Sequence, residues 1–156
     1  METNDGQRII ANILDVFAGK IPVSLLEQIA AQDLVCYMDR VRFKLGRNGL
    51  GTWFRYMHAT MRERQISVDV YIGRIEMVGP GRYNVSGALV TKHQNGRIET
   101  RQFAVTYLIE QGRVTTIWST RSNYVGVVGR SIRLPLYVGF MFHCLRAWYN
   151  KVSGAA

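Results

Sequence analysis

The pattern of hydrophobic and polar positions is clearest between residues 66 and 121, where four runs rich in Val, Ile, Thr, Tyr and Phe follow one another. Such runs are typical of β-strands. Glycine-bearing turn sequences separate the runs at 79–81, 94–96 and 111–112. Asn95-Gly96 favours a two-residue primed turn, which needs positive φ at both central positions. The pattern therefore predicts four consecutive strands of one antiparallel sheet, joined by hairpins.

The first of these runs changes phase in its middle. Its apolar residues fall on even positions from Ile66 to Ile72, whereas Ile75 and Met77 fall on odd positions. A β-bulge at Gly73-Arg74 would return the apolar side chains to one face and bend the strand. We therefore expect a strongly curved sheet. Helices on the concave side of such a sheet would close it into a cone with a cavity.

The residues before the sheet predict three helices that cover it. Residues 9–17 have helical spacing and predict a first amphipathic helix that ends at Gly19. Residues 24–27 (Ser-Leu-Leu-Glu) have the pattern of a capping box, which predicts a second helix from residue 24 to about residue 33. A short strand is expected at 34–38 and a glycine-bearing loop at 46–51. The apolar spacing of residues 50–61 predicts the third helix.

Length and composition indicate one domain in a reducing compartment. The chain has 156 residues, of which 47% are hydrophobic, enough for one well-packed core. Its net charge of +9 suits nucleic acid, an anionic membrane surface or an acidic ligand. Cys36 and Cys144 lack the spacing of a zinc site, so free thiols are expected. Together with a polar start that lacks the features of a signal peptide, this favours the cytoplasm.

The last part of the chain, 126–156, is expected to be a basic and apolar extension of a domain at 1–125. Its apolar run at 134–149 is shorter than the roughly 20 residues that span a bilayer, and Arg146 interrupts it. The run is apolar on almost all sides. An apolar helix here would need cover from the mouth of the cone, a second subunit or a membrane interface. Flanking basic residues keep peripheral membrane association as an alternative.

The order of elements over residues 7–122 resembles the NTF2-like superfamily, specifically its SnoaL-like and ketosteroid-isomerase-like branch. The resemblance rests on Gly19, on Tyr37-Met38-Asp39 before a loop, on Gly49 and Gly51, and on Gly112-Arg113-Val114 with Ile117 in the last strand. It implies an α+β fold in which three N-terminal helices cover a curved antiparallel sheet. This fold hosts isomerases, cyclases, dehydratases, epoxide hydrolases and non-catalytic binding proteins, so it does not imply one activity.

The resemblance also implies a role for Asp39, because the isomerase-like branch has its general base in this place. A carboxylate held against apolar walls has a raised pKa and can move a proton at carbon. The alternative is that Asp39 forms an ion pair at the surface, since Arg40, Arg42 and Lys44 are its neighbours in the chain.

The sequence departs from these enzymes in the groups that assist the base. The isomerases carry a tyrosine in the first helix, where this chain offers Leu14 or Asp15. They also carry an acid on the penultimate strand, where this chain has Ala104. The limonene-epoxide-hydrolase-like branch uses an Asp–Arg–Asp arrangement, and Ser119 stands where that family often has an acid. The proton donors of an enzyme with this sequence would therefore be substitutes.

Two function classes compete. The first is a cofactor-independent acid–base enzyme that acts on an apolar, oxygenated metabolite such as a polyketide or terpenoid, by isomerisation, cyclisation, dehydration or epoxide opening. Its catalytic residues would be Asp39, Tyr37 and Tyr107, and its hydrophobic pocket would bind the substrate through Trp53, Phe54, Met57, His58, Tyr71 and Trp118. The second is a non-catalytic module that uses its sheet and basic tail to bind a protein or a membrane surface.

Other partners and cofactors have less support in the sequence. No pair of histidines has the spacing of a metal site, and the glycine-rich segments lack the lysine of a phosphate loop, so no metal or cofactor is expected. Nucleic acid is disfavoured, because the arginines are scattered and not interleaved with exposed aromatic residues in a recognisable module. A homodimer through the sheet is expected from the resemblance.

Overall fold

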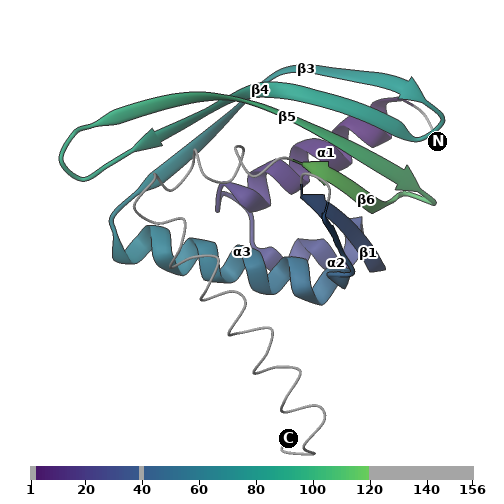
Figure 1. Cartoon of the computed structure of the whole chain (residues 1–156), viewed down its shortest axis with the longest axis horizontal. Coiled ribbons are helices and arrows are strands. Elements are labelled where there is room, and N and C mark those ends of the chain that lie inside the picture. Colours follow the sequence, from purple (N-terminus) through teal and green to yellow (C-terminus); the bar gives the residue numbers. More distant parts are fainter. Residues whose placement is uncertain (1–2, 39–40, 120–156) are drawn as a thin grey trace, which may run out of the picture.

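The structure of the protein is a computed structural model that describes residues 3–38 and 41–119. Helices and strands follow the predicted order, with one additional short strand (Figure 1). The elements are α1 (Thr3–Phe17), a 3-10 turn (Val23–Leu25), α2 (Leu26–Ile29), β1 (Ala30–Met38), β2 (Val41–Phe43), α3 (Gly46–Glu63), β3 (Ser67–Gly79), β4 (Arg82–Lys92), β5 (Ile98–Glu110) and β6 (Arg113–Ser119).

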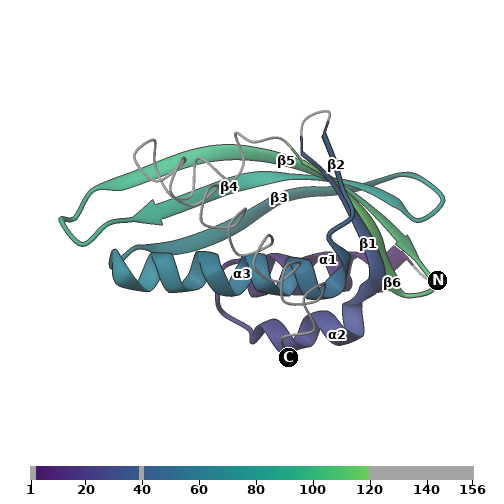
Figure 2. The same cartoon turned by 60° about the horizontal axis from the view of Figure 1, so that its bottom comes forward.

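One curved sheet organises the described part of the chain. Its six strands have the order β2-β1-β6-β5-β4-β3. The pairs formed by β3, β4, β5 and β6 are antiparallel, which confirms the predicted meander. β1 pairs in parallel with β6, a pairing that the sequence did not predict. α1 and α3 lie along the same side of the sheet (Figures 1 and 2), so the sheet has a helix-covered inner face and an outer face turned away from the helices.

The turns form at the predicted places, but their types differ from the prediction. Gln111 and Gly112 both have positive φ (51° and 75°), so the primed two-residue turn lies between β5 and β6. The loop at Asn95-Gly96 is longer than predicted. The amide of Gly96 donates to the carbonyl of His93 and the amide of His93 donates to the carbonyl of Arg97, and only Gly96 has positive φ (80°). The prediction of a primed turn there was therefore wrong.

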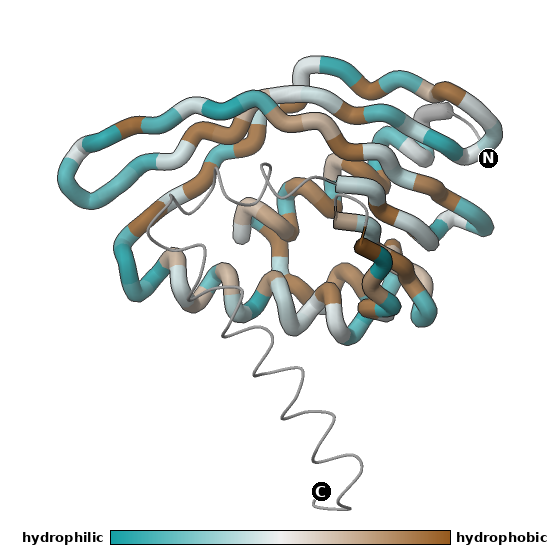
Figure 3. The backbone as a smooth tube through the Cα atoms, in the orientation of Figure 1, coloured by the Kyte–Doolittle hydropathy of each residue, from teal (hydrophilic) through white to brown (hydrophobic). Residues whose placement is uncertain are grey.

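The bulge in β3 is confirmed. The pairing of β3 with β4 shifts between Ile72 and Arg74, so Gly73 has no partner in the register. Val68 and Val70 before the bulge and Ile75 after it all contribute to the core or pack against it. The bulge thus keeps these three side chains on the inner face while the sheet bends, whereas Ile72 and Met77 of the same pattern are 40% and 51% exposed. Figure 3 shows the alternation of hydrophobic and hydrophilic positions along the strands.

The first helix is confirmed and the second is much shorter than predicted. α1 ends at Phe17, and Gly19 has φ of 76° just beyond it. The capping box does not form, because no side-chain cap bond is present at the start of the 3-10 turn or of α2. α2 ends at Ile29, and Ala30 already pairs with Val114 of β6. The strand that starts with this pair therefore replaces the helix predicted for residues 30–33.

The start of α3 also differs from the prediction. The helix begins at Gly46, so the segment expected as a loop forms its first turn. Gly46 has φ of 62°, and a side chain on it would meet the carbonyl oxygen of Gln32 in β1. Glycine is thus needed at this position because it allows both the left-handed conformation and the close approach.

The core lies between α1, α3 and the inner face of the sheet. Its fully buried side chains include Ile10, Ile13, Leu34, Met57 and Tyr83. Within the described ranges, no helix is both long and apolar enough to cross a bilayer. The predicted C-terminal helix and the extension at 126–156 lie outside the described residues.

Packing between neighbouring strands predicts the effect of Gly87→Ala. A Cβ at Gly87 would overlap the carbonyl oxygen of Tyr71 and approach the ring of Phe103, so the substitution should cost about 1–3 kcal/mol of unfolding free energy. Urea denaturation should show a lower midpoint with an unchanged slope. Gly79→Ala is the control, because its Cβ would meet only Arg82, at 4.0 Å. Equal midpoints for the two variants would contradict this packing.

Candidate active-site cavity

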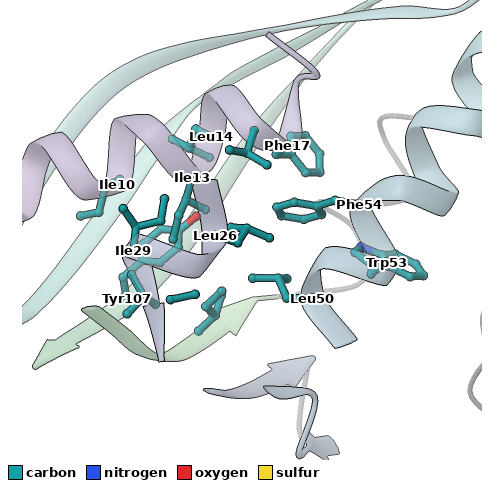
Figure 4. Close-up of a cluster of buried hydrophobic side chains, with 14 of the residues drawn as sticks. Ile10, Ile13, Leu14, Phe17, Leu26, Ile29, Leu50, Trp53, Phe54 and Tyr107 are labelled. Atoms are coloured by element: carbon teal, nitrogen blue, oxygen red, sulfur yellow. The ribbon is translucent and has the colours of Figure 1, made fainter. Parts of the chain in front are cut away.

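A small apolar cavity lies between α1, α3 and the inner face of the sheet. Its volume is about 40 Å³. Figure 4 shows Phe17, Leu50, Phe54 and other members of the surrounding cluster pointing toward one another between the elements. The lining residues are Ile13, Leu14, Phe17, Leu50, Phe54, Leu89, Phe103, Val105, Tyr107, Ile117 and Ser119.

The periodicity of each element explains this lining. Ile13 and Phe17 are four residues apart on α1, and Leu50 and Phe54 are four residues apart on α3, so each pair lies on one face of its helix. The strands contribute every second residue, from Phe103 to Tyr107 on β5 and from Ile117 to Ser119 on β6. Phe17 and Phe54 meet edge to face, with ring centroids 5.9 Å apart at 75°. The two helices therefore close the cavity through an aromatic pair.

Two hydroxyl-bearing residues contribute the polar side chains of this lining. Tyr107 is 3% exposed and Ser119 is 5% exposed. All other lining side chains are hydrocarbon. Ser119 pairs with Met38 across the parallel β1–β6 contact, and Met38 immediately precedes Asp39 in the chain. Asp39 itself, the predicted general base, lies outside the described residues.

The structure brings only some of the predicted site residues to this cavity. Phe54 and Tyr107 line it, as expected. Trp53 and Met57 are buried in the core but do not belong to the lining. His58 does not line the cavity either, because its Nε2 forms a 3.0 Å hydrogen bond with the carbonyl oxygen of Phe17. His58 thus joins α3 to the end of α1.

Three predicted residues lie on the outer face of the sheet instead. Tyr37 and Trp118 stack on each other there, with centroids 5.8 Å apart and rings inclined by 9°. Strand alternation explains their position, since their neighbours Cys36 and Ile117 are buried on the inner face. Tyr71 is 58% exposed and pairs with Ala88. Contrary to the prediction, these three side chains do not line the cavity.

Other lining residues were not predicted from the sequence. Leu89 and Phe103 line the cavity from β4 and β5. The alternation along these strands predicts which residues face the helices, but it does not predict where on that face a cavity remains. Leu14, one of the two residues expected at the position of the isomerases' tyrosine, lines the cavity. Ala104, expected at the position of their acid, is exposed, and its neighbours Phe103 and Val105 line the cavity instead. The described lining contains no acid. Nor do the described residues form a cluster of three or more His, Cys, Asp or Glu that could hold a metal ion.

Comparison with solved structures identifies the architecture. An epoxide hydrolase from M. tuberculosis, described as LEH-like, superimposes with a TM-score of 0.61 at 17% identity, over 81% of this chain and 89% of its own. IdmH, a candidate polyketide cyclase from Streptomyces antibioticus, has a TM-score of 0.62 at 14% identity, over 78% of this chain and 94% of its own. The fold is NTF2-like. Similar structures also include a ketosteroid-isomerase-like and a further NTF2-like protein.

The NTF2-like fold does not decide the activity of this chain. No protein-family model and no curated protein matches the sequence. A de novo designed protein with a curved β-sheet is as similar as the enzymes, with a TM-score of 0.60 at 14% identity, over 88% of this chain and 98% of its own. Similarity at this level reflects the curved sheet and its helices, so activity has to be argued from the side chains of the site.

Burial of Cys36 predicts slow reaction of its thiol. Burial raises the pKa of Cys36 from 9.0 to about 11, so its thiolate at pH 8 should be about 100-fold scarcer than in the unfolded chain. A Cys144→Ser variant leaves Cys36 as the single cysteine. Ellman's reagent should label this variant rapidly in denaturant and at least about 100-fold more slowly when folded. Equal labelling rates would contradict the burial of Cys36.

Proposed function

We propose that this chain is a cofactor-independent acid–base enzyme that acts on an apolar, oxygenated metabolite of the polyketide or terpenoid type. The main support for this proposal is the hydrocarbon cavity of the NTF2-like cone, whose lining includes the hydroxyl-bearing residues Tyr107 and Ser119. Apolar walls bind a hydrocarbon skeleton, and a few convergent polar groups orient its oxygen atoms. The activities named for the similar epoxide hydrolase and candidate cyclase belong to the same chemical class.

Asp39 is the general base in this proposal. Its support comes from the chain itself, since Asp39 directly follows Met38, and Met38 pairs with the cavity-lining Ser119. A carboxylate beside hydrocarbon walls is poorly solvated, which raises its pKa toward neutral pH and makes it a better base. Removal of a proton from carbon would start an isomerisation, cyclisation or dehydration, whereas removal of a proton from water would start an epoxide opening.

Tyr107 is the proton donor in this proposal. Tyr107 is a buried lining residue, and a phenol can donate a hydrogen bond to a substrate oxygen on which negative charge develops. Ser119 is a second hydroxyl of the lining. In this proposal the two hydroxyls do the work of the tyrosine and acid that assist the base in the isomerases, since this chain has Leu14 or Asp15 and Ala104 at those positions.

The proposal requires the cavity to open. A volume of about 40 Å³ holds about three water molecules, and any terpenoid or polyketide is larger. The Phe17–Phe54 contact joins the two helices at the cavity. Aromatic pairs of this kind contribute about 0.5–1.5 kcal/mol beyond the burial of their area, so a bound apolar skeleton could replace the contact. Rotation of Phe54 away from Phe17 is therefore the expected opening step.

A proton-abstraction probe tests the role of Asp39. The probe is 5-nitrobenzisoxazole, from which a base removes one ring proton while the nitrogen–oxygen bond breaks to give a coloured cyanophenolate. The wild-type protein should convert the probe faster than an equal concentration of acetate does. Asp39→Asn should lower kcat/KM by about 100-fold or more. Asp33→Asn is the matched control, because Asp33 is an exposed acid on β1. Equal losses in both variants, or a wild-type rate no greater than that of acetate, would overturn the role.

Truncation of the aromatic pair tests access to the cavity. Phe54→Ala should cost about 3–5 kcal/mol of unfolding free energy, and the enlarged apolar space should bind indole. Titration calorimetry should detect binding of indole to this variant. The Tm of the variant should rise with the concentration of indole. Met57→Ala, a buried residue of α3 outside the lining, should not bind indole. Phe54→Leu provides a milder variant, and absence of indole binding to both Phe54 variants would contradict the assignment of the cavity.

A second candidate function is a non-catalytic binding module, which would act through its sheet, as a homodimer or with another protein. The small volume of the cavity favours this candidate, because the side chains of α1 and α3 fill most of the cone. The similarity to a de novo designed protein with a curved β-sheet supports the same point, since this fold is not restricted to enzymes. Failure of the proton-abstraction test together with absence of indole binding would favour this candidate.

A further inference from the structure

A continuous row of side chains crosses the outer face of the sheet. Each member pairs in register with the next one on the neighbouring strand, through β2, β1, β6, β5, β4 and β3 in turn. We call this set the outer row. Its members are Arg42, Tyr37, Trp118, Thr106, Asn84 and Glu76. The sequence does not reveal the row, because its residues lie in six separate segments.

Trp118 lies at the centre of an aromatic and cationic stack on this face. Tyr37 stacks on it from the β1 side, with ring planes 9° apart. The guanidinium of Arg82, which comes from β4 on the other side of Trp118, lies 5.0 Å from the centroid of the indole ring. Arg82 is exposed and forms no ion pair with another described residue. Its charge is therefore available to an anion.

A groove runs beside Trp118 along the same face. Its volume is about 450 Å³, within the range of small-molecule sites. Thr106 donates a 2.8 Å hydrogen bond to Asn84 in the lining, and Ser86 adds a further hydroxyl. Arg74 and Glu76 form a 2.9 Å ion pair in the lining, so the carboxylate of Glu76 is neutralised. The groove thus combines an indole ring with polar side chains, and the guanidinium of Arg82 lies next to it over the ring of Trp118.

We propose that this groove binds a nucleotide, with its base stacked on Trp118 and its phosphate held by Arg82. A base that stacks on the indole displaces the guanidinium of Arg82, and the exposed side chain of Arg82 then turns to the phosphate. Stacking of a base on an aromatic ring is stronger than an exposed cation–π contact, so the exchange is favourable. Outward aromatic side chains on a β-sheet are a recurring platform for bases, and the net charge of +9 attracts an anion.

The groove and the cavity share Val105 and Ser119 in their linings. The inference is nevertheless independent of the enzyme proposed above, because it uses Trp118 and Arg82, and neither lines the cavity. The nucleotide can be free or part of a single-stranded nucleic acid, since both present the same base and phosphate. A second copy of this chain is the competing occupant of the face. The groove fits it less well, because the centres of protein interfaces are depleted of Glu, whereas Glu76 lines this groove beside Arg74.

Fluorescence anisotropy of a labelled oligouridylate of about ten nucleotides tests the site at about 50 and 200 mM salt. Trp118→Ala should weaken binding at least about fivefold, and Trp118→Phe, which keeps an aromatic ring, should retain most of it. Arg82→Gln should weaken binding. It should also reduce the slope of the logarithm of the binding constant against the logarithm of the salt concentration by about one. Arg62→Gln is the charge-matched control, because Arg62 is exposed on α3. Competition by uridine monophosphate would assign the site to free nucleotides, and failure to compete would assign it to single strands.

Three results would overturn the inference. The first is undiminished oligouridylate binding by Trp118→Ala. The second is an equal effect of Arg62→Gln and Arg82→Gln, which would show attraction to net charge without a site. The third combines two observations. The wild-type protein sediments as a dimer, and the Trp118→Ala variant sediments as a monomer that binds the oligouridylate with the same affinity as the wild type. That result would assign the outer face to self-association. Circular dichroism of each variant verifies that it is folded.

Discussion

The alternation of side chains along β4 and its neighbours is the constraint on which the rest of the structure depends. Tyr83, Val85 and Leu89 are buried against the helices, whereas Asn84 and Ser86 between them are exposed. A shift of one residue in register would exchange the two faces, so the hydrophobic core holds the strands in place. The bulge at Gly73 is the adjustment that keeps this alternation intact through the bend of β3.

The curvature that creates the inner cavity also limits its size. A bent sheet leaves space above its concave face, and α1 and α3 lie over that face (Figure 2). Their side chains, among them Phe17 and Phe54, line the space that remains. The edge-to-face contact of Phe17 with Phe54 fills one end, and about 40 Å³ remains. Such a site is well suited to raise the pKa of a carboxylate at its edge, because hydrocarbon walls solvate charge poorly. It accommodates a substrate only if the aromatic contact opens.

Architecture and chemistry are separate properties in this fold. An epoxide hydrolase, a candidate cyclase and a designed protein have the same curved sheet at 14–17% identity with this chain. The fold depends on many positions, each of which needs only the right polarity and approximate size. Activity depends on a few side chains with particular functional groups, and here hydrocarbon side chains such as Leu14 and Phe103 make up most of the described lining. The hydroxyl-bearing residues Tyr107 and Ser119 thereby become the central elements of any chemistry in the described cavity.

The sequence by itself determined the meander, the first and third helices, and the bulge in β3. These features depend on local signals, namely strand periodicity, helical spacing, turn glycines and a change of phase at Gly73. It also identified Phe54 and Tyr107 as cavity residues. Only the tertiary structure decided that the strand begins at Ala30, because the pairing of Ala30 and of Val35–Met38 with β6 outweighs the helical pattern of residues 30–33. It alone placed Tyr37 and Trp118 on the outer face beside Arg82, since such contacts join strands that are distant in the chain.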